Sequence, residues 1–315
     1  MNDQNPLAPF LERNGFLILD GGLATELEAR GYDLADELWS ARLLIDEPDA
    51  IKQVHANYLV AGADCIITAS YQGTIRGFMK RGLSEEEAIG LLKLSIQLAL
   101  DARDEFWTDL NNRLHRQKPI VAASIGPYGA ALADGSEYTG DYDLDEEGLV
   151  EFHCKRLHIL SDSDADILAC ETIPSFKETL ALAQLLGEIP GRFAWFSFSC
   201  SDGRHISDGT PIGDCVGRLD DIEQVAAMGI NCTSPRFIPS LVQEVRKITD
   251  KPIVVYPNSG EEYDPQQKRW LGITDSADFA SASKLWCAAG ASLVGGCCRT
   301  GPEHIRRIRQ SLISG

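Results

Sequence analysis

The chain has 315 residues, of which 44% are hydrophobic, so it can form one large domain or two ordinary ones. Its formal net charge of −18 argues against a nucleic-acid partner, because such a partner selects a basic surface. The N-terminal stretch lacks the basic and apolar regions of a signal peptide, and no apolar run approaches the ~20 residues that span a bilayer. We therefore expect a cytoplasmic protein with reduced thiols and no membrane partner.

Eight short apolar runs recur along the chain, and most are continuous rather than alternating. This pattern is typical of strands that are buried on both faces of a parallel sheet. In chain order the predicted strands are 16–20, 64–70, 119–124, 166–171, 193–199, 228–232, 252–257 and 291–298.

Helical patterns lie between the predicted strands. The clearest is 84–107, where Ser84 and Glu87 have the spacing of a capping box, and two further helices are expected to begin after Ser175 and Thr300. Eight strand–helix units without a dividing linker predict a single (β/α)8 TIM-type barrel, treated as one domain over residues 1–315. A doubly wound open sheet is the alternative.

Polar or thiol residues end the predicted strands with unusual regularity. In a (β/α)8 barrel the carboxyl ends of the strands converge on one mouth, so we expect the functional site there. Three long polar segments, 126–143, 201–214 and 257–272, are expected to form its walls. The strand-end residues are Asp20, Ser70, Ser124, Glu171, Ser199, Asn231, Cys232, Asn258, Cys297 and Cys298.

Two of these residues, Cys297 and Cys298, are adjacent. A disulfide between neighbours is disfavoured, because adjacent Cα atoms are ~3.8 Å apart whereas disulfides span ~4.4–6.8 Å. Both thiols could be small core side chains. They could also bind zinc, with Cys232 as the third ligand and a fourth position left open, as in catalytic zinc sites. The spacing alone leaves the packing and zinc interpretations open.

The chain has nine cysteines, an odd number at irregular spacing, which does not indicate a disulfide framework. We expect structural roles for the other six, which are Cys65, Cys154, Cys170, Cys200, Cys215 and Cys287.

The chain resembles the homocysteine S-methyltransferases, most closely the short, cobalamin-independent type that uses S-methylmethionine or S-adenosylmethionine. The resemblance spans nearly the whole chain in order. It is carried by residues 19–31, 38–44, 61–74, 121–140, 171–175, 229–235, 254–261 (VVYPNSGE) and 295–305 (GGCCRTGPEHI).

This resemblance implies a (β/α)8 barrel with a zinc site at its C-terminal mouth. It implies Zn²⁺ ligands at Cys232, Cys297 and Cys298, and an amino-acid pocket formed by Asp20, Gly21, Gly22 and Glu171. Asn258 is expected to fill the vacant zinc position when substrate is absent. Because an aromatic face can hold a sulfonium, we also expect a donor pocket among Trp39, Tyr71, Gln72, Tyr128 and Tyr138.

The implied activity is zinc-dependent transfer of a methyl group from a sulfonium donor to the thiol of homocysteine, which gives methionine. Two alternatives remain open: methyl transfer to selenocysteine or another small thiol, and a non-catalytic zinc-binding or redox-sensing barrel. The expected partners are these small molecules only, and a monomer is expected.

Overall fold

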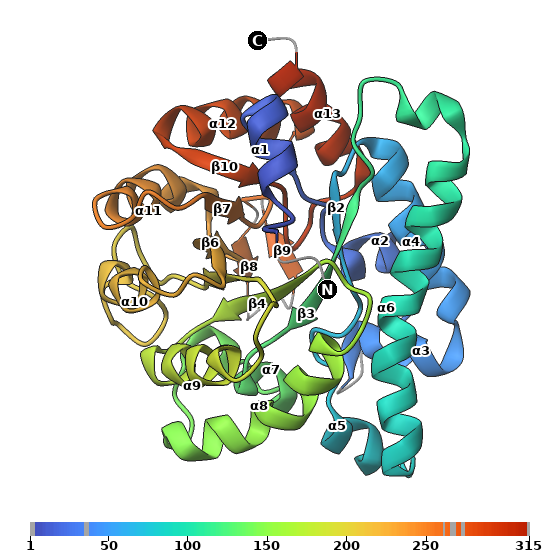
Figure 1. The fold of residues 1–315 in the computed structure, drawn as a ribbon, viewed down its shortest axis with the longest axis vertical. Coiled ribbons are helices and arrows are strands. Elements are labelled where there is room, and N and C mark those ends of the chain that lie inside the picture. Colours follow the sequence, from blue (N-terminus) through green and yellow to red (C-terminus); the bar gives the residue numbers. More distant parts are fainter. Residues whose placement is uncertain (1–3, 35–37, 261, 265–268, 272–274, 314–315) are drawn as a thin grey trace.

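Eight parallel strands form a nearly closed barrel with helices around it (Figure 1). The structure is a computed structural model that describes residues 4–34, 38–260, 262–264, 269–271 and 275–313, without the side chains of Trp39 and of 261–274. The sheet order is β1-β10-β7-β6-β5-β4-β3-β2, and a parallel bridge between Leu19 and Cys65 joins its two ends. The predicted (β/α)8 barrel is therefore confirmed, and the open sheet is wrong.

Each of the eight predicted apolar runs contains or overlaps one barrel strand. Their side chains are almost all buried, as expected for strands covered on both faces. The barrel strands are β1 (Leu17–Ile18), β2 (Cys65–Ile67), β3 (Ile120–Ile125), β4 (Ile167–Ile173), β5 (Ala194–Phe198), β6 (Val225–Asn231), β7 (Ile253–Tyr256) and β10 (Ala291–Val294).

Helices follow the strands and cover the outside of the barrel. The α-helices are α1 (Ala8–Asn14), α2 (Leu23–Ala29), α3 (Leu43–Asp46), α4 (Pro48–Ala61), α5 (Ile75–Lys80), α6 (Glu85–Thr108), α7 (Tyr128–Leu132), α8 (Glu146–Ser161), α9 (Phe176–Gly187), α10 (Ile212–Leu219), α11 (Ile238–Arg246), α12 (Ser276–Ala289) and α13 (Pro302–Ile313). Short 3₁₀ helices are η1 (Trp39–Arg42), η2 (Leu110–Arg113), η3 (Ser136–Tyr138) and η4 (Pro235–Phe237).

The predicted helix starts agree with the structure. The Ser84 hydroxyl and the Glu87 carboxylate form both halves of a capping box before α6, and Ser175 caps α9 through the N–H of Glu178. One predicted loop is different: the segment 257–272 contains a two-stranded antiparallel hairpin of β8 (Glu262–Asp264) and β9 (Arg269–Leu271).

Two hydrophobic layers hold the barrel together and leave its cavity at one end. The larger one packs the helices onto the outside of the sheet, and a smaller one fills the barrel interior around Trp195 and Val254. Leu7 and Phe10 of the α1 region belong to the inner layer, and α1 lies across one end of the barrel in Figure 1. That end is filled by apolar side chains, so the cavity described below forms where the strands end at their carboxyl termini.

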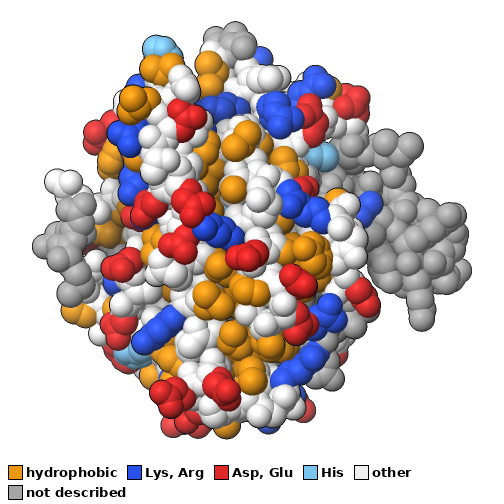
Figure 2. Space-filling model, turned by 90° about the vertical axis from the view of Figure 1, so that its right-hand side faces the viewer, with side chains coloured by type: hydrophobic (Ala, Val, Ile, Leu, Met, Phe, Trp, Pro, Cys, Tyr) orange, Lys and Arg blue, Asp and Glu red, His pale blue; other side chains and the backbone are white. Residues whose placement is uncertain are grey.

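The exterior carries mixed charge. Figure 2 shows acidic, basic and hydrophobic side chains interspersed on one side of the barrel, so the net negative charge is not gathered into a patch on that face. Among the described residues, no helix combines the length and apolar character needed to cross a bilayer.

Candidate active site

A cavity of about 420 Å³ lies at the carboxyl ends of the strands. Its size is in the range of small-molecule sites, ~300–1,000 Å³. The side chains come from segments far apart in the sequence, including the residues after β1, β2, β6 and β10, the last residues of β4, and the 3₁₀ turn η3. The polar and thiol residues that line it include Asp20, Thr25, Glu28, Ser40, Thr68, Tyr71, Gln72, Glu137, Tyr138, Glu171, Thr172, Cys232, Tyr256, Cys297, Cys298 and Arg299.

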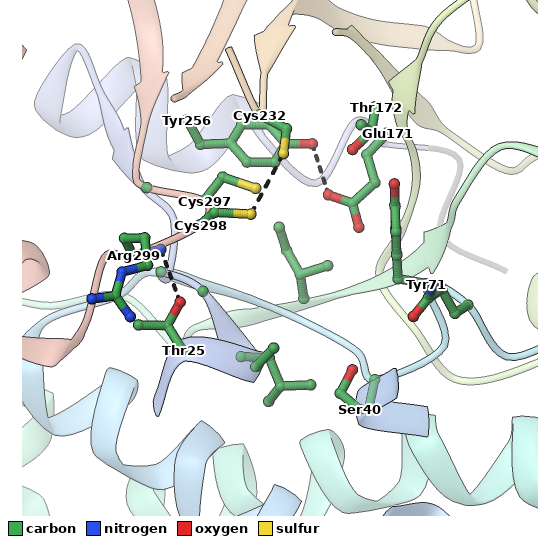
Figure 3. A pocket seen from close by; sticks show the side chains of 18 of the residues that line it. Thr25, Ser40, Tyr71, Glu171, Thr172, Cys232, Tyr256, Cys297, Cys298 and Arg299 are labelled. Atoms are coloured by element: carbon green, nitrogen blue, oxygen red, sulfur yellow. Dashed lines mark hydrogen bonds between the residues drawn. The ribbon is translucent and has the colours of Figure 1, made fainter. Parts of the chain in front are cut away.

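Three thiols meet in this cavity. The Sγ atoms of Cys232, Cys297 and Cys298 all lie within 4.8 Å of one another, and those of Cys232 and Cys298 are 3.6 Å apart. Figure 3 shows the three sulfur atoms grouped on one side of the cavity, facing the carboxylate of Glu171. A tetrahedral zinc with Zn–S bonds of ~2.3 Å places its sulfur ligands ~3.8 Å apart. The observed cluster therefore fits three thiolates of one tetrahedral metal.

The backbone turns sharply where these cysteines leave their strands. Cys232 and Arg299 have φ values of 48° and 65°, in the left-handed region that residues with side chains seldom adopt. Hydrogen bonds fix the turns: the N–H of Cys232 donates to the carbonyl of Tyr256 and the N–H of Cys297 to that of Pro257. Such strained conformations persist only where the surroundings hold them, and they cluster at functional sites.

The three thiols interact with one another and with a phenol. Hydrogen bonds from Cys232 and Cys297 hold the pKa of Cys298 well below that of a free thiol. The Tyr138 hydroxyl lies 3.6 Å from Cys232 Sγ, and the negative sulfur raises the pKa of Tyr138. A thiolate is thus favoured at Cys298, and a thiolate is the form that binds metals.

Glu171 lies across the cavity from the thiols, and both oxygens of its carboxylate accept hydrogen bonds. The Ser124 hydroxyl donates to Oε1, and the Tyr256 hydroxyl donates to Oε2 at 3.0 Å. Burial nevertheless raises the pKa of Glu171 to about 7, although both hydrogen bonds lower it. The carboxylate is consequently poised to gain from a cationic ligand.

Asp20 is the second buried carboxylate of the cavity, with 3% of its surface exposed. Its Oδ2 accepts from the N–H of Ile67 at 2.8 Å. Burial raises the pKa of Asp20 well above its usual range, and the charge of Glu171 raises it further. Two buried carboxylates close enough to repel each other, with no side-chain cation paired to either in the described chain, favour a cationic ligand.

Gly21 and Gly22 also line the cavity, and the turn after Cys297 packs directly against them. A Cβ atom on Gly22 would lie 2.6 Å from the carbonyl oxygen of Cys297, and one on Gly21 would lie 2.8 Å from that of Thr300. The N–H of Gly22 donates to the Thr300 carbonyl at 3.0 Å. These glycines therefore set how closely the thiol-bearing turn approaches Asp20.

Of the other residues predicted for the site, some line the cavity and others do not. Tyr71, Gln72 and Tyr138 line the cavity. Asn258 accepts a hydrogen bond on Oδ1 from the N–H of Cys298 at 3.2 Å and is absent from the described lining, so its role as a stand-in ligand stays a prediction. The side chain of Trp39 lies outside the described residues.

Tyr128 is placed elsewhere by the structure. Its ring packs edge-on against those of Tyr142 and Phe152, 5.3 and 4.9 Å away, and it is not among the described residues that line the cavity. The physical reason is that Tyr128 begins α7, which turns this side chain toward α8 rather than toward the thiols.

Buried charged side chains of α8 and α9 hold the segment 126–143, which carries Tyr138, and the loop that carries Tyr71. Glu178 is completely buried and accepts from the N–H of Tyr128 at 2.6 Å and from Nε2 of His153 at 2.7 Å. Arg156, also buried, donates to the carbonyl oxygen of Tyr71 at 3.4 Å. The loops after β2 and β3 are thus tied to α8 and α9 beneath the cavity.

Several lining residues were not among the sequence candidates. Glu137 and Arg299 lie on turns, and Tyr256 is the last residue of β7. The expected wall 201–214 contributes no described lining residue, whereas 126–143 does. The other six cysteines are all free and lie outside the described lining. Only Tyr256 had a sequence signal, because strand alternation from Val254 points it into the barrel.

Comparison with known proteins agrees with this geometry. The homocysteine S-methyltransferase family model matches residues 17–312. The chain is 55% identical over 304 residues to homocysteine S-methyltransferase YbgG of Bacillus subtilis (strain 168), covering 96% of each. It is 49% identical to selenocysteine Se-methyltransferase of Brassica oleracea var. italica, covering 96% of this chain and 90% of that one.

A solved structure supports the same assignment. The crystal structure of homocysteine methyltransferase MmuM from Escherichia coli in its metallated form matches with a TM-score of 0.88 and 45% identity, covering 97% of this chain and 99% of that one. A family model over nearly the whole chain, a relative above half identity and a matching barrel agree with one another. The chain therefore belongs to the homocysteine S-methyltransferase family and is an enzyme of that family.

Proposed function

We propose that this enzyme transfers a methyl group from a sulfonium donor, S-methylmethionine or S-adenosylmethionine, to the thiol of L-homocysteine, giving methionine. The observation that carries the proposal is the convergence of three thiols and two buried carboxylates on one cavity. We further propose that residues 1–315 act as one catalytic domain in the cytoplasm, with these small molecules as its partners and as a monomer.

The metal we assign to the site is Zn²⁺, held by Cys232, Cys297 and Cys298. Support comes from the sulfur spacing, the preference of zinc for thiolates and the metallated state of the Escherichia coli relative. Bound zinc would keep the thiol of homocysteine deprotonated at neutral pH, which supplies the nucleophile. With the three cysteines as its protein ligands, the ion would still have room for that thiol.

The two buried carboxylates orient the acceptor. The ammonium of homocysteine, placed between Glu171 and Asp20, relieves their mutual repulsion and the cost of burying them. Ser124 and Tyr256 keep the Glu171 carboxylate in position from below. The acceptor sulfur then faces the thiols on the opposite side of the cavity.

The transfer itself is a direct displacement at carbon. The acceptor thiolate forms a bond to the donor's methyl carbon while the bond from that carbon to the sulfonium sulfur breaks, and the electron pair stays on the donor sulfur. A cation and an anion thus become two neutral thioethers. Because charge disappears in this step, a cavity with little water favours it over bulk solvent. The proton of homocysteine leaves before the transfer, so no side chain has to act as a base during it.

A metal analysis combined with a donor comparison tests this function. The purified enzyme should contain about one zinc per chain and should methylate homocysteine with S-methylmethionine or S-adenosylmethionine, but not with betaine, which lacks a sulfonium. Active enzyme without bound metal, or activity with betaine alone, would contradict the proposal.

A second acceptor is worth the same assay. Selenocysteine Se-methyltransferase of Brassica oleracea var. italica is 49% identical to this chain. We propose that selenocysteine, whose selenol ionises more readily than a thiol, also accepts the methyl group here. Competition between selenocysteine and homocysteine for one donor measures the preference.

A further inference from the structure

The cavity contains more negative charge than one amino-acid substrate can use. Four carboxylates line it, Asp20, Glu28, Glu137 and Glu171, and the one cationic side chain of the described lining is Arg299. Asp20 and Glu171 form the buried pair described above, at the ends of β1 and β4. Glu28 and Glu137 belong to α2 and η3 and are less buried than that pair. Burial raises the pKa of Glu28 and of Glu137, and the charge of Cys298 adds to the rise in both, so the two carboxylates lie within electrostatic reach of the thiols.

Glu137 is held firmly although it lies on a turn. Its carbonyl accepts from the Ser199 hydroxyl at 3.2 Å. The η3 turn is closed by the N–H of Tyr138, which donates to Gly135 at 3.0 Å, and its start is capped by Asp134 through the N–H of Ser136 at 2.9 Å. Gly129 packs so tightly under this turn that a Cβ atom there would lie 2.4 Å from the nitrogen of Glu137. These contacts thus fix the backbone position from which the Glu137 side chain enters the cavity.

This carboxylate lacks a cationic partner. Oε2 of Glu137 is buried and makes no hydrogen bond, and no ion pair to it is found in the described chain. Burial raises the pKa of Glu137 above its usual value, although the nearby backbone N–H groups of Gly135 and Glu137 lower it. A half-buried carboxylate without a counter-ion costs free energy in the empty enzyme, which a cationic ligand would recover.

We propose that Glu137 binds the α-ammonium of the methyl donor and so selects sulfonium donors that are amino acids. This inference rests on the proposed function, because it assumes a sulfonium donor and a homocysteine acceptor. Burial raises the pKa of Glu28, and the nearby charge of Arg299 opposes that rise. Arg299 also lines the cavity and supplies a cation for the donor's carboxylate.

The arrangement distinguishes donor from acceptor. Both substrates are amino acids in which a short carbon chain separates the ammonium from the reacting sulfur. In-line transfer places the two sulfurs on opposite sides of the methyl carbon, so the two ammonium groups extend in different directions and need separate sites. Asp20 and Glu171 serve the acceptor, since Glu171 faces the thiols, whose metal would bind the acceptor sulfur. Glu137 then serves the donor.

The test is Glu137→Gln, with Asp141→Asn as the matched control. Asp141 is an exposed carboxylate that follows the same turn and is absent from the described cavity lining. We expect Glu137→Gln to raise the KM for S-methylmethionine or S-adenosylmethionine by about 10- to 100-fold, as for loss of a charge-assisted hydrogen bond. The KM for homocysteine and the metal content should stay within about twofold of wild type, and Asp141→Asn should behave as wild type.

A donor without the amino group provides the second measurement. 4-(Dimethylsulfonio)butanoate is S-methylmethionine lacking its ammonium, and wild type should use it far less efficiently. Glu137→Gln should reduce that discrimination by about tenfold or more. An unchanged donor KM with unchanged discrimination would overturn the inference while leaving the proposed function intact. A rise only in the homocysteine KM would assign Glu137 to the acceptor and overturn it too, whereas wild type that uses no sulfonium donor would overturn the proposed function itself.

Discussion

The hydroxyl of Tyr256 donates a hydrogen bond of 3.0 Å to Oε2 of Glu171, across 85 residues of sequence (Figure 3). Tyr256 is itself fixed from inside the barrel, because Trp195 Nε1 lies 3.1 Å and Ser197 Oγ 2.6 Å from its oxygen. Residues of three strands, β4, β5 and β7, therefore act together to aim one carboxylate at the cavity. The barrel core and the substrate site are connected at this point.

Removal of the Glu171 charge should weaken acceptor binding selectively. We expect Glu171→Gln to raise the KM for homocysteine by about 10- to 100-fold, because a charge-assisted hydrogen bond to the ammonium becomes a neutral one. The KM for the donor should change by less than about threefold. Steady-state kinetics with each substrate varied in turn measures both values.

Tyr256→Phe is a milder variant of the same site, because it leaves the Glu171 charge in place. The control for both is Glu151→Gln, since Glu151 is an exposed carboxylate of α8. Loss of one hydrogen bond to Glu171 should raise the homocysteine KM by about 2- to 10-fold. Equal KM values in wild type and Glu171→Gln would remove Glu171 from the acceptor site.

The pKa of Glu171, about 7, predicts a pH dependence of acceptor binding in the free enzyme. Because this pKa is raised, the carboxylate is neutral below pH 7 and charged above it, while the ammonium of homocysteine stays protonated throughout. The homocysteine KM should therefore fall as pH rises through 7, and should climb by up to about tenfold for each unit below it. Asp20 and the thiols also titrate near this site, so the diagnostic quantity is the ratio of the KM values of Glu171→Gln and wild type. That ratio should shrink toward one as pH falls from 8 to 5; a constant ratio would contradict the assignment.

The strands and the convergence of the thiols could be predicted because both follow from local sequence. Continuous apolar runs identify barrel strands, and parallel strands bring Cys232 and Cys297 to the same mouth wherever the intervening helices pack. The direction of Tyr128 could not be predicted, since it depends on how α7 leaves β3. Glu137 could not be found either, because its position is set by Ser199 and by backbone contacts within a turn that has no periodic pattern.

The cysteine cluster predicts that both zinc binding and activity require the thiol of Cys298. Cys298→Ala should lose bound zinc and methyl transfer together, because two thiolates hold zinc far more weakly than three. The chain should still fold, since Cys298 is outside the hydrophobic layers that hold the barrel. Elemental analysis, circular dichroism and the methyl-transfer assay check the three outcomes.

Cys287→Ala is the matched control, because Cys287 is a partly buried free thiol on α12, remote from the described cavity lining. It should keep its zinc and its activity. Metal-free Cys298→Ala with full activity would show that the cluster has no catalytic role.

Gly22→Ala tests whether the close approach of the two cavity walls matters. A methyl group at this position would meet the Cys297 carbonyl at 2.6 Å and Thr25 Oγ1 at 2.7 Å, and Thr25 Oγ1 also accepts from the N–H of Arg299 at 2.9 Å. The turn that carries the thiols must then move away from Asp20, at a cost of ~1–3 kcal/mol typical of overpacking. We expect weaker zinc retention against a chelator and a lower kcat/KM.

Gly90→Ala is the control, because Gly90 lies inside α6 with open space around it. It should raise stability by ~0.5–1 kcal/mol and leave activity unchanged. If both variants retain zinc and activity equally, the spacing between Gly22 and the Cys297 turn is not what organises the site.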